Sequence, residues 1–184
     1  MRRFPLAFLI LGVLSLLMAG AVTLGVAQSP TTTDLAVHNG AGETLGASEV
    51  VGHYTASSLG ADVVSFVYQP GAATEVARGP HGAVKAKRSV TGASAAAILQ
   101  PVQALLNIQN FSEHGSVYRS TEPLAALVPP SQRALVSGTY RTEVQLSGGY
   151  VVDVHLAINA VEQGQKVSQT VDYRLTRVGS WEAT

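Results

Sequence analysis

GTYRTEVQLSGGYVVDVHLAINAVEQGQKVSQTVDYRLTRV, residues 138–178, is the stretch that decides the fold of this chain. It reads as three consecutive strands, joined by Gly148-Gly149 and by residues 162–165. A period of two places successive side chains on opposite faces of a sheet, so one face of the middle strand is predicted to be apolar. The apolar row consists of Tyr150, Val152, Val154, Leu156 and Ile158. The alternate row on the other face consists of Val151, Asp153, His155, Ala157 and Asn159.

Two hairpins are predicted upstream of this stretch. Residues 49–58 and 63–70 flank a glycine-containing loop, and residues 74–78 and 83–90 flank Gly79-Pro80-His81-Gly82. Short runs rich in β-branched and aromatic residues on either side of such breakers are typical of antiparallel hairpins. Side chains that share one face of the second strand are Val64, Phe66 and Tyr68. The basic cluster Lys85-Ala86-Lys87-Arg88 is interpreted as a solvated strand face or a sheet edge guarded by charge.

Helical periodicity appears only between the strands. Residues 94–109 carry apolar side chains at spacings of three and four, which predicts an amphipathic helix. Pro101 lies inside it, so either the helix kinks there or a second helix begins with Pro101 in its first turn. Ser94 is interpreted as a helix cap. A short helix is also predicted over residues 123–130, with Thr121 as its cap.

The order of strands, a helical insertion and more strands predicts an α+β fold. It is built on a long antiparallel sheet with helices packed on one face. Residues 28–42 are small and polar and are predicted to be a linker, with a helical turn at residues 43–48. A single domain is predicted over residues 43–184.

The N-terminal 27 residues have the anatomy of a secretory signal peptide. Arg2 and Arg3 precede an almost unbroken apolar run over residues 4–18, and Gly25-Val26-Ala27 forms a small-residue cleavage site. The alternative is an uncleaved membrane anchor over residues 4–27. Either way, the rest of the chain is expected outside the cytoplasm, secreted or held in the cell envelope. With no cysteine, the exported part forms no disulfide and carries no cysteine-linked lipid.

The charge balance argues against a nucleic-acid partner. The chain has 12 basic and 12 acidic residues, and charged residues make up 13% of it. Nucleic-acid binding requires a concentrated cationic surface, which this sequence lacks. We expect a monomer with no cofactor.

No constellation in the sequence predicts catalysis or metal binding. The histidines at positions 38, 53, 81, 114 and 155 include no pair at the spacing of a helical zinc site. Asp153 and His155 share a strand face and can in principle hold a metal or relay a proton, but both are expected to face solvent. The chain is therefore not expected to be an enzyme.

The apolar side chains of the predicted strands and helix allow two interpretations. These side chains fill a solid core, or they line a cavity between a strongly bent sheet and its covering helices. The candidates for lining such a cavity are Phe66, Tyr68, Ile98, Val102, Leu105, Tyr150, Val152, Val154, Leu156 and Ile158.

Residues 64–178 resemble actinobacterial exported proteins related to the mycobacterial lipoproteins of the LppX/LprG type. The matching stretches are FVYQPGAATEV, ILQPVQALLNIQNF running into EHGSVYRS, and the final strands LVSGTYRTEVQLSGGYVVDVHLAINA and VSQTVDYRLTRV. The resemblance implies the half-barrel fold of the periplasmic lipoprotein carrier LolA, a curved antiparallel sheet with helices on its concave face. It also implies binding of lipid or acyl chains. The lipoproteins carry a lipidated cysteine where this chain has Gly25-Val26-Ala27-Gln28, so a membrane tether here depends on an uncleaved residue 4–27 segment.

Two functions from different classes follow. The first is a non-enzymatic envelope protein that binds a hydrophobic ligand between sheet and helices. The second is an extracytoplasmic NTF2-like or cystatin-like accessory domain that binds a protein partner, with Trp181 packing a final strand into the sheet. A long helix over residues 43–59, with none over residues 94–109, would favour the second function.

Overall fold

The computed structural model describes residues 30–105, 108, 110–127, 137–162 and 165–184. Its helices are α2 (Thr32–Gly46), α3 (Ala95–Ile98) and α4 (Gln100–Leu105), with 3-10 turns η1 (Ser57–Leu59), η2 (Pro80–Gly82) and η3 (Leu124–Leu127). Its strands are β1 (Val50–Ala56), β2 (Val63–Gln69), β3 (Gly71–Arg78), β4 (Val84–Ala93), β5 (Ser112–His114), β6 (Val117–Pro123), β7 (Ser137–Ser147), β8 (Tyr150–Glu162), β9 (Gln165–Val178) and β10 (Trp181–Glu182). The proposed signal segment, residues 1–27, lies outside the described residues.

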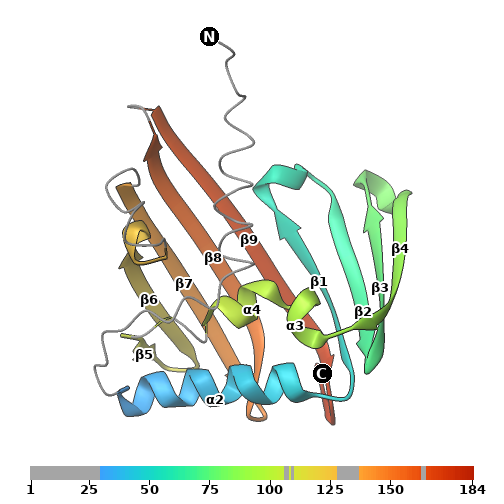
Figure 1. Cartoon of the computed structure of the whole chain (residues 1–184), viewed down its shortest axis with the longest axis horizontal. Coiled ribbons are helices and arrows are strands. Elements are labelled where there is room, and N and C mark those ends of the chain that lie inside the picture. Colours follow the sequence, from blue (N-terminus) through green and yellow to red (C-terminus); the bar gives the residue numbers. More distant parts are fainter. Residues whose placement is uncertain (1–29, 106–107, 109, 128–136, 163–164) are drawn as a thin grey trace.

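The strands form one antiparallel sheet in the order β4-β3-β2-β1-β9-β8-β7-β6-β5, with β10 paired to β9. The edge strands β4 and β5 do not pair with each other, so the sheet is curved but unclosed. Pairing of β1 with β9 joins the early hairpins to the late ones. The helices lie together over one face (Figure 1). The α+β half-barrel predicted from the sequence is confirmed.

The hairpin of β7 and β8 turns at Gly148 and Gly149, which have φ values of 59° and 84°. Positive φ at both central residues is the requirement of a type I′ turn, which suits the right-handed twist of the flanking strands. The joint predicted at Gly148-Gly149 is therefore found in the structure.

The alternation predicted for the middle strand holds from Asp153 to Asn159 and is wrong at Val151. Leu146 pairs with Val151 while Gln145 pairs with Asp153, so Val152 is an extra residue in β8. Such a β-bulge changes which side chains reach each face. Val151 is therefore fully buried, although the alternation placed it on the polar face.

The linker predicted over residues 28–42 is wrong from Thr32 onward, because this segment begins α2. Asp34 accepts hydrogen bonds from the backbone N–H and the hydroxyl of Thr31, and the Thr31 hydroxyl accepts from the backbone N–H of Asp34. This reciprocal arrangement is a capping box, which satisfies the free N–H groups of the first helical turn. The helical turn predicted over residues 43–48 is the last turn of the same helix, which ends at Gly46.

The helix predicted over residues 94–109 is two helices, α3 and α4. Pro101 stands in the first turn of α4, as one of the two alternatives predicted. The backbone N–H of Ala97 donates to the Ser94 hydroxyl over 3.3 Å, which confirms Ser94 as the cap of α3. Of the predicted segment, residues 106, 107 and 109 lie outside the described residues.

The short helix predicted over residues 123–130 is present in part, as the 3-10 turn η3 over Leu124–Leu127, but β6 extends through Thr121 to Pro123 before it. Thr121 and Pro123 pair with Arg141 and Thr139 of β7, so Thr121 is a strand residue and not a cap. The 3-10 turn η3 follows, and residues 128–130 lie outside the described part. The pairing of β6 with β7 therefore outweighed the local sequence signal that favoured Thr121 as a helix cap.

The core lies between the concave face of the sheet and the helices. One apolar row crosses five neighbouring strands through the cross-strand partners Val144, Val154, Tyr173, Tyr54 and Val64. The rings of Tyr54 and Tyr173 are stacked with centroids 4.9 Å apart, and Phe66 packs against both. The predicted shared face of β2 is confirmed, because Val64, Phe66 and Tyr68 are all buried.

The outer face of the sheet is polar and extensively ion-paired. Arg174 pairs with Asp153 over 3.1 Å, and His155 pairs with Asp172 over 2.5 Å. The basic cluster of residues 85–88 lies on β4, an exposed strand at one end of the strand order. Its interpretation as a charged edge is confirmed.

Candidate functional site

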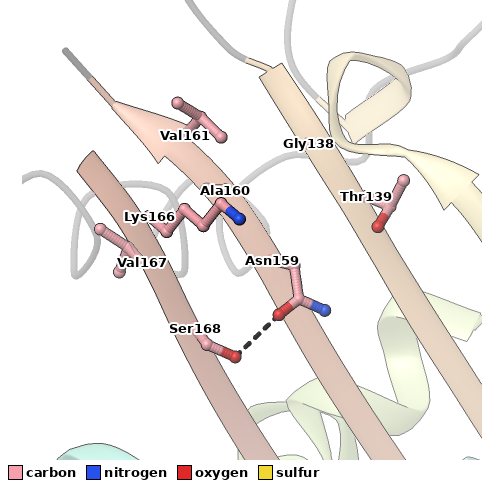
Figure 2. Close-up of a pocket in the computed structure, with 8 residues that line it drawn as sticks. All are labelled: Gly138, Thr139, Asn159, Ala160, Val161, Lys166, Val167 and Ser168. Carbon is pink, nitrogen blue, oxygen red and sulfur yellow. Dashed lines mark hydrogen bonds between the residues drawn. The ribbon is translucent and has the colours of Figure 1, made fainter. Parts of the chain in front are cut away.

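A pocket of about 450 Å³ lies where the first residues of β7 and β9 meet the last residues of β8. Figure 2 shows these three strand ends side by side. The lining residues are Gly138, Thr139, Asn159, Ala160, Val161, Lys166, Val167 and Ser168. Small-molecule sites usually have volumes of about 300–1,000 Å³, so this pocket is large enough for a small ligand.

Three pocket residues continue the concave, apolar face of the sheet. Gly138, Ala160 and Val167 are cross-strand partners, and each stands two residues from the next concave-face row. That next row contains Tyr140, Ile158 and Gln169. This row of the concave face therefore adjoins the buried core at Ile158.

Gly138 is a position that only glycine fits. Its φ is +125°, and an added Cβ would lie 2.0 Å from the carbonyl oxygen of Asn159. Because the contact is with backbone, no side-chain movement relieves it. A hydrogen in place of a side chain lets β7 approach β8 closely at the pocket.

The remaining pocket residues follow the outer-face alternation. Thr139 pairs with Asn159, Asn159 pairs with Ser168, and Val161 pairs with Lys166. The Ser168 hydroxyl donates to the Asn159 side-chain oxygen over 2.8 Å (Figure 2). Five of the eight lining residues therefore belong to the outer face of the sheet, and the three paired residues Gly138, Ala160 and Val167 belong to the concave face.

The helices cover the other end of the concave face. A Cβ added at Gly40 of α2 would lie 2.8 Å from Leu146 Cδ2 and 3.5 Å from the oxygen of Gly149, so α2 crosses close to the β7–β8 turn. The distance along β8 from Val151, beside α2, to Ala160, in the pocket, is about 30 Å, at roughly 3.3 Å per residue. The described helices lie toward the α2 end (Figure 1).

Hydrogen bonds fasten this helical cover to the sheet. The Thr44 hydroxyl accepts from the backbone N–H of Val151 over 2.9 Å and donates to the oxygen of Gly40 over 2.7 Å. The Tyr173 hydroxyl donates to the oxygen of Ile98 over 3.2 Å. Burial, with a smaller contribution from neighbouring Tyr54, raises the pKa of Tyr173 far above its ordinary value, so this donor stays protonated.

Seven of the ten residues predicted to line a ligand cavity lie on the sheet, and Ile98, Val102 and Leu105 lie on α3 and α4 of the cover. Nine are buried and Tyr150 is half-buried. None of the ten lines the pocket described above. A cavity formed by these residues stays a prediction. The pocket itself was missed, because its residues become neighbours only once the register of three strands is known.

The other chemical candidates have structural partners. Asp153 and His155 each pair with a side chain on β9. Among the described residues, no group of three or more His, Asp or Glu side chains is arranged to hold a metal ion. No helix in the described part of the chain is both long and apolar enough to cross a membrane.

These features define a class of α+β protein, an open antiparallel sheet with helices on its concave face and a pocket at one end. No protein-family model matches the sequence, and no curated protein is significantly similar to it. Among solved structures, the crystal structure of LprF from Mycobacterium bovis is similar with a TM-score of 0.47 and 16% sequence identity, covering 85% of this chain and 97% of LprF. At this degree of similarity we carry no ligand and no residue role over from LprF. The fold follows from the strand pairing itself.

Proposed function

We propose that this chain is a non-enzymatic protein of the cell envelope that binds a hydrophobic ligand, a lipid or an acyl chain, between its sheet and its helices. The observation that carries the proposal is that the described helices cover the α2 end of the concave face, while the concave-face row of Gly138, Ala160 and Val167 at the other end is only half-buried. This half-buried row gives a ligand a route from solvent to the apolar rows beside Ile158.

The surface available to such a ligand is apolar and backed by a packed core. Ala160 and Val167 are half-buried in the pocket, and Ile158 of the adjoining row is 6% exposed. Each Å² of apolar surface that a ligand and this wall remove from water contributes about 25 cal/mol. A hydrocarbon chain laid along this row therefore gains affinity without requiring a charged partner.

Export is proposed from the sequence. Residues 1–27 have the anatomy of a signal peptide, and an uncleaved form would anchor the protein to the membrane. The resemblance of residues 64–178 to the LppX/LprG-type proteins supports both an envelope location and a lipid ligand. We propose that the protein acts outside the cytoplasm in either form.

Catalysis is not part of the proposal, because the polar groups that suggested chemistry serve the fold. Ser94 caps a helix, while His155 and Asp153 are half-buried members of cross-strand pairs. Neither arrangement places a nucleophile beside a base in the pocket.

Two features of the structure agree with the alternative, a domain that binds a protein partner. Helix α2 precedes the strands, and Trp181 of β10 packs against the core and donates to the Ser147 hydroxyl over 3.1 Å. However, residues 50–56 form a strand, and α3 and α4 occupy residues 95–105. This is not the helix pattern expected for an NTF2-like or cystatin-like domain, so the ligand-binding function is preferred.

Lipid analysis of the purified protein tests the proposal. The protein isolated from producing cells is extracted with organic solvent, and the extract is examined by mass spectrometry. We expect a lipid in stoichiometric amount, reduced several-fold by Ala160→Phe, which places a ring at the half-buried end of the concave face. Ala157→Phe on the outer face of the same strand is the matched control and should retain the lipid. Absence of lipid from the wild-type protein, or equal loss in both variants, would contradict the proposal.

A further inference from the structure

Strand β4 forms one edge of the open sheet, and one side of its backbone pairs with no described strand. It is the first strand in the order and lies at the right-hand side of Figure 1. All of its residues except the last are exposed. The edge strand at the other end, β5, has 3 residues, whereas β4 has 10. Because alternate residues of an edge strand direct their N–H and C=O groups away from the sheet, β4 offers the longer template for an added strand.

The central part of β4 keeps the regular geometry that strand addition requires. Its pairing with β3 is irregular at both ends, between Gly71 and Ala72 and between Ala77 and Arg78. Between these irregularities, residues 86–91 pair with β3 without interruption. At roughly 3.3 Å per residue this run is about 20 Å long, which is the length of an ordinary strand.

The charge on this edge is positive. Strand β4 carries Lys85, Lys87 and Arg88 and no acidic residue. Lys85 is paired with Asp62 over 2.6 Å, and Arg88 is paired with Glu75 on the concave face over 2.9 Å. Lys87 has no carboxylate partner in the part of the chain that the structure describes. Its charge is therefore available to a partner.

The two faces of an added strand would meet different surroundings. Ala86 and Val90 continue the apolar concave face, because they pair with Ala77 and Ala73 of β3, which pair in turn with buried residues of β2. Val90 is 38% exposed, so an apolar side chain beside it would cover it. Lys87 lies on the opposite, outer face by the alternation of the strand. The edge therefore fits a strand in which apolar and acidic side chains alternate.

We propose that β4 binds an extended acidic segment of a protein partner, which adds to the sheet as a further strand. Acidic side chains on the outer face meet Lys87, and apolar side chains on the concave face cover Ala86 and Val90. A second copy of this chain fits less well, because pairing of two β4 strands brings the cations of both copies onto adjacent strands. This partner site lies beyond the proposed function and does not depend on the ligand.

The test measures binding of end-blocked peptides to the purified protein by fluorescence anisotropy. The acidic probe alternates valine with glutamate, VEVEVEV, and its counterpart has lysine in place of glutamate. The acidic probe should bind about tenfold more tightly, and added salt should narrow the difference. Lys87→Glu should weaken binding of the acidic probe about threefold to tenfold. Lys166→Glu, which reverses an exposed charge on β9, is the matched control and should leave it unchanged.

Pairing through the backbone is tested separately from charge. Two further acidic probes carry N-methyl groups on every valine or on every glutamate, which removes the N–H donors from one edge of the peptide strand or from the other. One of them should bind as the parent does and the other should not, because an added strand uses a single edge. Equal affinity of the two methylated probes, equal binding of the acidic and basic probes, or no effect of Lys87→Glu would overturn the proposal. Dimerisation of the protein alone that the acidic probe disrupts would make a second copy the occupant and would also overturn it.

Discussion

The two ends of β8 lie on the same concave face and differ in what covers them. Val151 and Val154 are 0% and 1% exposed beneath the helices, whereas Ala160 at the other end is only half-buried. At the first end, Gly40 lets α2 approach closely and Thr44 bonds to β8. At the second end, small side chains and a glycine that tolerates no Cβ leave a pocket. The same strand pattern thus supports a sealed core or an accessible site, according to where the helices lie.

The largest expected loss of stability is for a residue in the core beneath the helices. Phe66→Ala should lower the free energy of unfolding by about 3–5 kcal/mol, because it removes a buried ring and leaves a cavity. Phe66 is 1% exposed and packs against Tyr54 and Tyr173. Val161→Ala, at the pocket, should change stability by less than about 0.5 kcal/mol. Denaturant unfolding measures both, and equal losses would remove the distinction between the two halves.

The second largest expected loss of stability follows from removing the hydrogen bond between Thr44 of α2 and Val151 of β8. Thr44→Val should cost about 1–3 kcal/mol, because the buried N–H of Val151 loses its acceptor while the side-chain volume is kept. Thr139→Val in the pocket is the matched control, since Thr139 is exposed. Chemical denaturation should show a loss for Thr44→Val alone. A Thr44→Val protein as stable as the wild type would mean that α2 is held by packing only.

Acid should weaken the same end of the molecule through Asp34. Burial alone would raise the pKa of Asp34, but hydrogen bonds from Thr31, Phe111 and Asn110 lower it on balance below its ordinary value of 3.8. A carboxyl with a lowered folded-state pKa stabilises the fold above its unfolded pKa, and the stabilisation is lost as the pH falls through the folded value. The free energy of unfolding should therefore decline on acidification below about pH 5. Asp34→Asn should flatten this decline, and parallel pH profiles would refute the assignment.

The smallest expected change in stability is the difference between alanine substitutions at two glycines of α2. Gly42 has open space around its Cα, so Gly42→Ala should stabilise the protein by about 0.5–1 kcal/mol through helix propensity. Gly40→Ala should yield a smaller gain or a loss, because its Cβ meets Leu146 at 2.8 Å. Thermal unfolding of both variants measures the difference. An equal gain at the two positions would show that α2 does not lie as close to the sheet as described.

Most of the sheet was predictable from the sequence, because alternation and glycine turns act locally. The hairpins β1–β2, β3–β4 and β7–β8 follow directly from such signals. Pro101 and Ser94 likewise identified the start of α4 and the cap of α3, since capping depends on neighbouring residues.

The errors arose where a distant contact outweighed the local pattern. Helix α2 contains Gly40 and Gly42 and reads as a linker, yet it is stabilised by its capping box and by packing against β7 and β8. The bulge at Val152 depends on how β7 pairs with β8. The pocket depends on the register of β7, β8 and β9 together, which no single strand specifies.

The most direct test of the proposed function is to locate the residues that an apolar ligand contacts. Amide chemical shifts are followed by NMR while dodecanoate is titrated into the delipidated protein. The account predicts saturable changes at Gly138, Ala160 and Ser168, with little change at Val64 and Phe66. Changes centred on Val64 and Phe66, or no saturable change at the pocket, would contradict it.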